Sequence, residues 1–517
     1  MSIIQGTSKT SAAGGVPFDT ELIPDSVFLD GSADFLTSSA LSAQSDAGNF
    51  VAATWLQRND FARTQRWITL TSSSASKHGF GFFNSDDTMR WQNDNFFREA
   101  STPVYRDIGW YHVIVSVSPS TCEIYINGIL QASTTLVSGG GFGPTFRPQS
   151  DGYVFVIGAD QGAGSLFKGY LAQTIYLDGH SIQSSDVAVT DFLEAFTYGD
   201  NGSQFGPKAN SDVAGLASAA GANSFCLDYA NSSDLGNDIS SKGNDFSPTS
   251  MSSANQSENT PSLNYATMDI QKNDGSNTST MGFSEGNTRV TGSAGSGGGS
   301  FSTLPLLTSG TTEFQTTFKN GDGVVGICCY DNLLAVSTSA SRNVTGGLGI
   351  NYNAAYGYKE NGDKIVILSG GATSSSQGAA LTTNSVVTVR YNADDNEITF
   401  LKDNVAQGSV VATVAGLTYY AFASRFNNYD ISFHFESAKF PHTIGSGNLE
   451  INSENQPTPE AQGVDNFAIT LAQEGSLFSG MGTAEADFTG SGTVRIYKSR
   501  TSGSGAESWG YSFSHDA

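Results

Sequence analysis

One short stretch of this sequence combines aromatic side chains with carboxamides and a carboxylate, a combination suited to binding sugars. It spans residues 91–97, and its aromatic ends enclose a run of four polar residues. Aromatic rings can stack on the faces of sugar rings, while Asn and Asp side chains hydrogen-bond the hydroxyl groups. A polar pair at residues 160–161 has the same character. The candidate glycan-binding residues are therefore Trp91, Asn93, Asp94, Asn95, Asp160 and Gln161.

These residues also have a purely structural interpretation. Trp91, Phe96 and Phe97 can fill a protein core, because large aromatic side chains are mostly buried. Asn and Asp are common turn formers, so the polar run can simply connect two strands. Loops of this kind also offer oxygen ligands that suit Ca²⁺, while no other cofactor is expected. The sequence alone leaves these alternatives open.

The composition narrows the classes of protein to which the chain can belong. Its 517 residues suffice for about three or four domains of ~150 residues each. Glycine is abundant and only 14% of residues are charged, which favours many short strands over amphipathic helices. The formal net charge is −24 without any run of Lys or Arg, so we expect no nucleic-acid partner. No stretch reaches the ~18 apolar residues of a membrane span, so we expect no membrane insertion.

The four cysteines do not indicate a zinc site. Cys122, Cys226, Cys328 and Cys329 show neither C-x-x-C spacing nor a nearby pair of histidines. Because consecutive residues of a strand point to opposite faces, we predict that the two adjacent cysteines are small, buried, apolar side chains on opposite faces of one strand.

Residues 109–131 carry a clear β-hairpin pattern. Valines alternate with other residues across 113–117, which is the period of two expected for a strand with one face on a core. After a break at Pro119, a second alternating run ends at Asn127-Gly128, a dipeptide preferred in type I′ turns. The aromatic start, the spacing and the turn together resemble the central hairpin of the laminin-G and concanavalin-A-like jelly-roll family.

A longer region resembles bacteriophage virion proteins that carry a laminin-G-like domain. The resemblance covers about residues 26–268 and includes strands at 50–58 and 167–179, where Gln173 replaces the Glu usual in that family. Its most specific part lies in the strings at 225–248 and 259–268, which resemble the segment that follows the jelly roll in the same family.

A second sandwich is indicated by a resemblance to the SPRY fold. The segments 323–328, 355–358, 386–391, 397–404 and 418–422 follow the order of the SPRY strands. Val405 stands where that family usually has Gly, and Tyr391 stands near a usual acidic residue. The resemblance therefore implies the sandwich but no inherited ligand site.

Together these patterns predict an all-β fold of tandem antiparallel β-sandwiches. One is a concanavalin-A-like jelly roll, one is SPRY-like, and a small β-rich segment ends the chain. The glycine-rich run at 292–300 is interpreted as a linker or a long hairpin loop. The connector is expected to contain one short helix within 187–198. The predicted divisions are an N-terminal arm or disordered segment at 1–24, the jelly roll at 25–182, a connector at 183–264, the SPRY-like sandwich at 265–452 and the C-terminal segment at 453–517.

No catalytic constellation is evident, so we do not expect an enzyme. Retaining glycoside hydrolysis needs two carboxylates about 5 Å apart. The nearest string, Glu485 to Asp487, lacks a third acidic residue and lies in the small C-terminal segment. Neither G-x-S-x-G nor H-E-x-x-H occurs, and His112, within a strand pattern, is interpreted as structural.

The phage resemblance implies a structural and adhesive virion protein, such as a fibre, spike or capsid-attached appendage. Its expected partners are other virion proteins, host surface glycans and further copies of itself in a homotrimer. The N-terminus shows no signal peptide, which fits assembly in the host cytoplasm and a final location on the virion. The alternatives are a polysaccharide depolymerase or glucanase, and a secreted bacterial adhesin.

Overall fold

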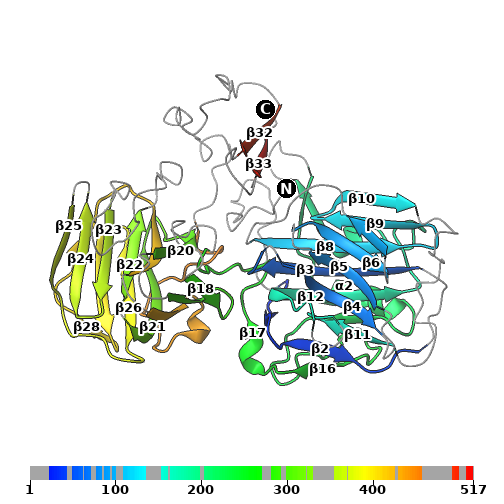
Figure 1. Cartoon of the computed structure of the whole chain (residues 1–517), viewed down its shortest axis with the longest axis horizontal. Coiled ribbons are helices and arrows are strands. Elements are labelled where there is room, and N and C mark those ends of the chain that lie inside the picture. Colours follow the sequence, from blue (N-terminus) through cyan, green and yellow to red (C-terminus); the bar gives the residue numbers. More distant parts are fainter. Residues whose placement is uncertain are drawn as a thin grey trace.

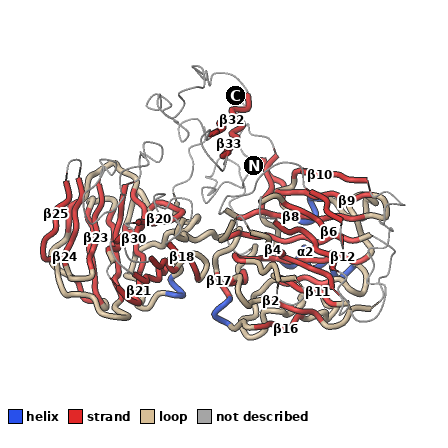
Figure 2. Tube along the Cα trace, viewed as in Figure 1, coloured by secondary structure: helices blue, strands red, loops and turns tan. Residues whose placement is uncertain are grey.

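The computed structural model of the chain consists mainly of antiparallel strands that form two β-sandwiches (Figure 1). Figure 2 shows how little helix accompanies them. This architecture confirms the predicted all-β fold of tandem sandwiches. The structure describes residues 22–42, 49–61, 63–71, 77–83, 87–93, 96–99, 109–135, 153–160, 164–197, 203–269, 281–292, 298–321, 323–329, 354–368, 371–425, 429–456, 492–499 and 508–515.

The first sandwich packs an eight-stranded sheet on a seven-stranded sheet. Its strands are β1 (Ser26–Asp30), β2 (Phe35–Ser38), β3 (Phe50–Arg58), β4 (Gln65–Thr71), β5 (Lys77–Phe83), β6 (Met89–Asn93), β7 (Phe96–Glu99), β8 (Trp110–Val117), β9 (Thr121–Ile126), β10 (Ile129–Thr135), β11 (Val154–Ile157), β12 (Lys168–Asp178), β15 (Phe225–Leu227), β16 (Phe246–Thr249) and β17 (Gln256–Ser257). The larger sheet has the order β10-β9-β8-β3-β12-β1-β17, with β15 beside β12, and the smaller has the order β16-β2-β11-β4-β5-β6-β7.

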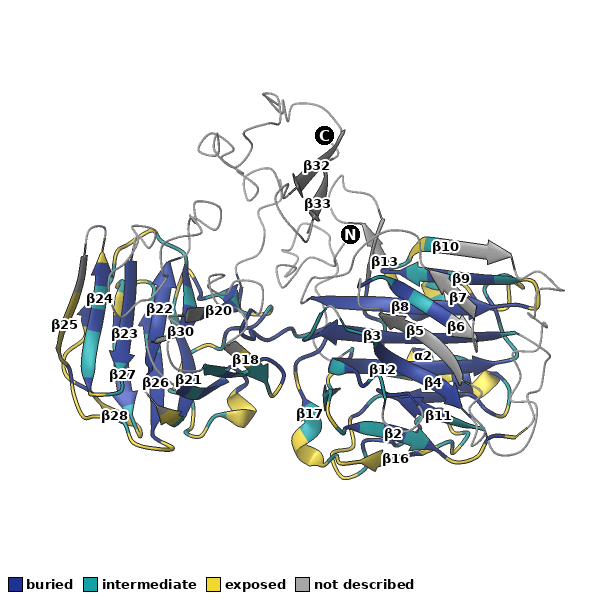
Figure 3. Cartoon of the chain, in the orientation of Figure 1, coloured by how far each residue is buried: buried dark blue, intermediate teal, exposed yellow. Residues whose placement is uncertain are grey.

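The predicted central hairpin is present and lies within the larger sheet. Strands β8 and β9 pair antiparallel, and β9 continues into β10 through Asn127 and Gly128, whose φ angles are 51° and 77°. Both residues thus adopt the left-handed conformation that a type I′ turn requires. The inward side chains of β8 and β9 join the core between the two sheets, and Figure 3 shows that the central strands of both sandwiches are buried.

Strand β12 is buried on both of its faces. Leu171 and Tyr176 belong to the core between the sheets, whereas Ala172 and Ile175 face a second apolar layer outside the larger sheet. The inward-facing residue has an odd number before the bulge, as at Leu171, and an even number after it, as at Tyr176. A β-bulge between Ala172 and Ile175 causes this change, because one extra residue reverses the alternation of faces. The outer layer is completed by the helix α2 (Asn210–Ala219), which the sequence did not reveal.

The bulge explains why this chain has Gln at position 173. Gln173 has a φ of 46° and is 1% exposed. Its Nε2 donates hydrogen bonds to the backbone oxygen of Lys208 at 2.7 Å and to Oδ1 of Asn210 at 3.0 Å, at the start of α2. Both partners are acceptors, so an ionised Glu at this position could not replace the carboxamide.

The segment at 183–264, which we expected to be a connector, also contributes strands to the first sandwich. Strands β15, β16 and β17 pair with β12, β2 and β1, so the segment completes both sheets of the first sandwich. The expected single helix is reduced to α1 (Val189–Phe192), and it is followed by a small hairpin of β13 (Glu194–Thr197) and β14 (Ser203–Gly206). A short 3₁₀ turn, η1 (Ser253–Asn255), precedes β17.

The second sandwich packs another eight-stranded sheet on a six-stranded sheet. Its strands are β18 (Met281–Ser284), β19 (Arg289–Gly292), β20 (Gly298–Pro305), β21 (Thr311–Gly321), β22 (Val324–Cys329), β23 (Ala354–Lys359), β24 (Asp363–Leu368), β25 (Gly371–Ser376), β26 (Val386–Asn392), β27 (Glu397–Lys402), β28 (Val405–Ala406), β29 (Val411–Ala412), β30 (Tyr419–Arg425) and β31 (Tyr429–His434). The orders are β18-β19-β31-β21-β26-β27-β28, with β29 beside β27, and β20-β30-β22-β23-β24-β25. The 3₁₀ turn η3 (Ser437–Lys439) follows β31.

The paired cysteines lie as predicted. Cys328 and Cys329 are both fully buried in β22, the first in an apolar cluster with Val324 and Ile365, the second in the core between the sheets. Their side chains thus occupy opposite faces of one strand. In the glycine-rich run, Gly292 ends β19 and Gly298 begins β20, so the run connects strands of different sheets.

The small C-terminal segment, predicted to be β-rich, contains two strands. They are β32 (Gly492–Ser499) and β33 (Ser508–His515), which pair antiparallel. The expected N-terminal arm lies, except for its last three residues, outside the described residues.

We predict that Gln173→Glu destabilises the first sandwich by about 2 kcal/mol or more at pH 8, because it buries a charge and removes two hydrogen bonds. Chemical denaturation monitored by fluorescence measures this. The loss should shrink at pH 4, where the carboxyl group is protonated and can again donate. The matched control, Gln131→Glu on β10, should change the free energy of unfolding by no more than about 0.5 kcal/mol. Equal effects of the two substitutions would contradict this role of Gln173.

Candidate glycan-binding rim of the first sandwich

Trp91 belongs to the hydrophobic core. It is 1% exposed and packs in the cluster that fills the space between the two sheets of the first sandwich. Its ring therefore has no free face on which a sugar could stack. The structural interpretation of this residue holds, because β6 directs the indole inward.

The remaining candidates fall into two groups that the strand register keeps apart. Asn93 ends β6 and is paired with His78, which in turn is paired with Leu70 of β4. Asp160 lies instead beside Arg66, near the other end of β4. Four residues of strand separate Leu70 from Arg66, about 13 Å at ~3.3 Å per residue. Asp94, Asn95 and Gln161 lie outside the described residues.

Asp160 makes local contacts with Arg66 and Gly164. Its carboxylate lies 3.7 Å from Nη1 of Arg66, an ion-pair distance, and the residue is 7% exposed. Its backbone N donates to the oxygen of Gly164 at 2.7 Å, which closes a tight turn before β12. Burial lowers the pKa of the Arg66 guanidinium, and the charge of Asp160 opposes that effect. Asp160 thus supports the loop at this end of the sandwich.

A second ion pair at the same end is completely buried. Nη2 of Arg58, at the end of β3, donates to Oδ1 of Asp87 at 2.9 Å, and neither side chain is exposed. Burial lowers the pKa of Arg58, while the Asp87 carboxylate favours the charged form. The guanidinium also lies 5.1 Å from the ring centroid of Phe61. Arg58, Asp87 and Arg66 were not recognised in the sequence, although an arginine ending an apolar strand was an available signal.

This end of the first sandwich is partly covered by the second sandwich. Nζ of Lys168, at the start of β12, donates to the backbone oxygen of Phe283 in β18 at 2.7 Å. Burial lowers the pKa of this lysine. We call this the joint end, and we call the opposite end, to which Leu70 and Asn93 belong, the distal end. Among the candidate glycan-binding residues that the structure describes, Asn93 lies at the distal end.

The acidic residues near the joint end are engaged in local contacts. The carboxylate of Asp30 accepts the backbone N of Ser32 at 2.7 Å and of Ala33 at 3.0 Å; the hydrogen bonds to Ser32 and Ala33 hold its pKa below the ordinary value against the opposing effect of burial. Asp60 pairs with Arg63 at 3.1 Å in a half-exposed contact. These carboxylates shape turns.

His112 is part of the core, and the described parts of the chain include no metal-binding group of side chains. His112 is buried against Trp55, with ring centroids 4.9 Å apart, and burial lowers its pKa to about 3, so it stays neutral at ordinary pH. Over those same parts, no group of three or more His, Cys, Asp or Glu side chains could hold a metal ion, and no helix is long and apolar enough to cross a membrane. Glu485 and Asp487 lie outside the described residues.

Comparison with known families supports the jelly-roll interpretation of the first sandwich. Residues 30–175 match a family model described as the concanavalin A-like lectin/glucanases superfamily. The match begins at the end of β1 and ends within β12, so it lies wholly inside the first sandwich. No curated protein matches the chain.

Several solved structures are similar to parts of the chain. The SPRY domain of human HERC1 is 13% identical with a TM-score of 0.25, covering 32% of this chain and 96% of that domain. The heptameric SAP-like pentraxin of Limulus polyphemus is 18% identical with a TM-score of 0.26, covering 32% of this chain and 78% of the pentraxin. A protein of Bacteroides ovatus proposed to bind carbohydrate is 12% identical with a TM-score of 0.22, covering 30% and 43% of the two chains.

We predict that Asp87→Asn costs about 3–5 kcal/mol of unfolding free energy, because it leaves the buried charge of Arg58 without its counter-ion. Thermal and denaturant unfolding of the purified chain measure the loss. The matched control at the same end, Asp60→Asn, should cost less than about 1 kcal/mol, because its ion pair is half-exposed. A double replacement, Arg58→Met with Asp87→Leu, should recover part of the loss; an Asp87→Asn variant as stable as Asp60→Asn would refute the assignment.

Proposed function

We propose that this chain is a structural and adhesive component of a bacteriophage particle whose first sandwich binds host surface glycans through its distal end. The observation that carries the glycan part is the match of residues 30–175 to the concanavalin A-like lectin/glucanases superfamily. Sandwiches of this kind bind ligands with loops at one rim of a rigid scaffold. The ion pairs of Arg58 and Arg66 supply that rigidity at the joint end, while Asn93 lies at the distal end.

The phage part of the proposal rests on the resemblance of residues 26–268 to virion proteins. This stretch has almost the same limits as the first sandwich, which runs from β1 to β17. The strings at 225–248 and 259–268 have structural roles in it, because β15 and β16 complete its sheets and the segment after β17 leads to the second sandwich. A resemblance that covers one complete folded unit is stronger support than scattered matches.

We further propose that the chain binds without hydrolysing its ligand. The carboxylates Asp87 and Asp160 are each paired with a buried arginine. A retaining glycosidase needs one carboxyl group as acid and another as nucleophile, about 5 Å apart and open to substrate. These two carboxylates at the joint end therefore give no support to the alternative function, a depolymerase or glucanase.

The test of glycan binding uses the full chain, labelled with a fluorophore, on a panel of bacterial strains and on their purified capsular and lipopolysaccharide glycans. The double variant Asn93→Ala with Asn95→Ala should reduce binding at least tenfold, because it removes two of the carboxamides that the sequence indicates as candidate glycan-binding groups. Asp60→Asn, at the joint end, should bind as the unsubstituted chain does. New reducing ends in the glycan would establish the depolymerase instead, and binding unaffected by the double variant would contradict the distal site.

The oligomeric state tests the virion role separately. Phage fibres are commonly homotrimers, and repeated subunits usually assemble symmetrically. Native mass spectrometry of the purified chain should therefore show a trimer. A monodisperse monomer would count against the fibre version, and immunogold labelling of a producing phage would then distinguish attachment to the capsid from absence on the particle.

A further inference from the structure

The two sandwiches are joined by a strap, residues 258–264, that is hydrogen-bonded to both of them. Nδ2 of Asn259 donates to Oε1 of Gln57 in β3 at 2.7 Å, and Oδ1 of the same side chain accepts the backbone N of Tyr265 at 3.0 Å. Asn259 is 1% exposed, so these bonds are shielded from water. The position of one sandwich relative to the other thus depends on polar contacts made by the strap.

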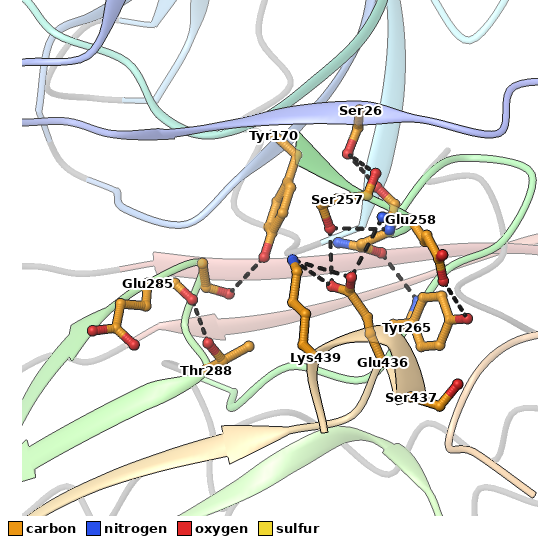
Figure 4. Close-up of polar contacts among 12 residues, drawn as sticks. Ser26, Tyr170, Ser257, Glu258, Tyr265, Glu285, Thr288, Glu436, Ser437 and Lys439 are labelled. Carbon is orange, nitrogen blue, oxygen red and sulfur yellow. Dashed lines mark hydrogen bonds and ion pairs between the residues drawn. The ribbon is translucent and has the colours of Figure 1, made fainter. Parts of the chain in front are cut away.

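A buried carboxylate of the second sandwich holds the start of the strap (Figure 4). Glu436, which precedes η3, accepts the hydroxyl of Ser257 at 2.9 Å and the backbone N of Glu258 at 3.4 Å. Nζ of Lys439 lies 3.0 Å from the same carboxylate. Lys439 supplies a positive charge, but its side chain is 42% exposed, so water and salt weaken its influence.

Two further carboxylates compete for one hydroxyl proton. The hydroxyl of Tyr265 lies 3.4 Å from Oε2 of Glu258 and 3.4 Å from Oε2 of Glu450. A tyrosine hydroxyl has one proton, so it can donate to only one of these acceptors at a time. When both carboxylates are ionised, one of them lacks this bond and the two negative charges repel. A protonated Glu258 would remove both problems, because it becomes a donor and loses its charge.

The remaining groups around Glu258 are mostly acidic. Asp25, just before β1, interacts with it from the first sandwich and is itself close to Asp228, just after β15, while Glu436 and Glu450 face it from the second sandwich. The positive charge of Lys439 has the opposite effect and lowers the pKa of Glu258. The hydroxyl of Tyr170 in β12 donates to the backbone oxygen of Gly286 at 3.4 Å, which is a further contact between the sandwiches. This contact does not depend on a carboxylate.

We propose that the joint between the two sandwiches is a proton-sensitive contact, in which protonation of Glu258 tightens the docking of one sandwich on the other and deprotonation loosens it. The device requires no ligand. It would couple the acidity of the surroundings to the rigidity of the whole chain.

The direction of the effect follows from the titration of the cluster. Desolvation and the carboxylates of Glu436 and Glu450 raise the pKa of Glu258. Desolvation, Asp228 and Glu258 raise the pKa of Asp25 to about 6. A raised pKa means that the docked state binds protons more tightly than the undocked state, so docking gains as pH falls through the raised pKa. Asp25, whose pKa is about 6, loses its negative charge as pH falls below that value, which removes one of the charges that interact with Glu258.

Hydrogen exchange measured by mass spectrometry on the full chain tests the proposal in any oligomeric state. The backbone amides of Glu258, Asn259, Tyr265 and Ser437 all donate hydrogen bonds at the joint. After correction for the intrinsic effect of pH on exchange, peptides covering 256–266 and 434–440 should exchange at least tenfold more slowly at pH 5 than at pH 8. A peptide from the core of β12 serves as the internal reference and should show no such change.

Two variants separate this mechanism from a general effect of acid. Glu258→Gln carries a neutral donor and should give, at pH 8, the protection that the unsubstituted chain reaches only at pH 5. Lys439→Met removes the opposing charge and should loosen the joint further at pH 8. The control Glu397→Gln, on the exposed edge of the second sandwich, should keep the full pH dependence. Equal corrected exchange at both pH values, faster exchange at pH 5, or an undiminished pH dependence in Glu258→Gln would overturn the proposal.

Discussion

The first sandwich depends on a strand that must be covered on both sides. Strand β12 has apolar side chains on each face, so the larger sheet cannot leave its outer face to water as many antiparallel sheets do. Helix α2 and the segment before β15 supply the cover. The bulge at Gln173 then serves two purposes, because it keeps both faces apolar and directs a carboxamide to the start of the covering helix. Helix α2 and the larger sheet are thus held together by apolar packing and by the hydrogen bonds of Gln173.

The arrangement of the two sandwiches gives the ends of the first one different roles. At the joint end, buried charges and the contact between Lys168 and Phe283 fix the loops, which leaves little freedom for a ligand. Asn93, a candidate binding residue that the structure describes, lies at the distal end. The joint thus sets the orientation of one sandwich relative to the other, while the proposed binding rim lies at the opposite end of the first sandwich.

Local signals made much of this fold predictable. The turn at Asn127-Gly128 and the opposite faces of Cys328 and Cys329 follow from dihedral preferences and strand geometry, which a few neighbouring residues determine. Long-range pairing was less accessible. Helix α2 is made mostly of small residues with a weak apolar stripe, so its own sequence gives little sign of a helix. Its packing on β12 is what stabilises it. Likewise, the pairing of Arg58 with Asp87 links residues 29 positions apart, and no local pattern indicates it. The burial of Trp91 agrees with the structural interpretation, which its residue type already favoured.

The cysteines supply built-in reporters of local opening. Cys226 lies in the outer layer of the first sandwich and Cys328 in the six-stranded sheet of the second, and burial raises the pKa of each thiol well above its ordinary value. A thiolate in water reacts with disulfide reagents, whereas a shielded thiol does not. The modification rate at each position therefore measures how often its own sandwich opens, so the two halves of the chain can be followed independently in a single reaction without any engineered label.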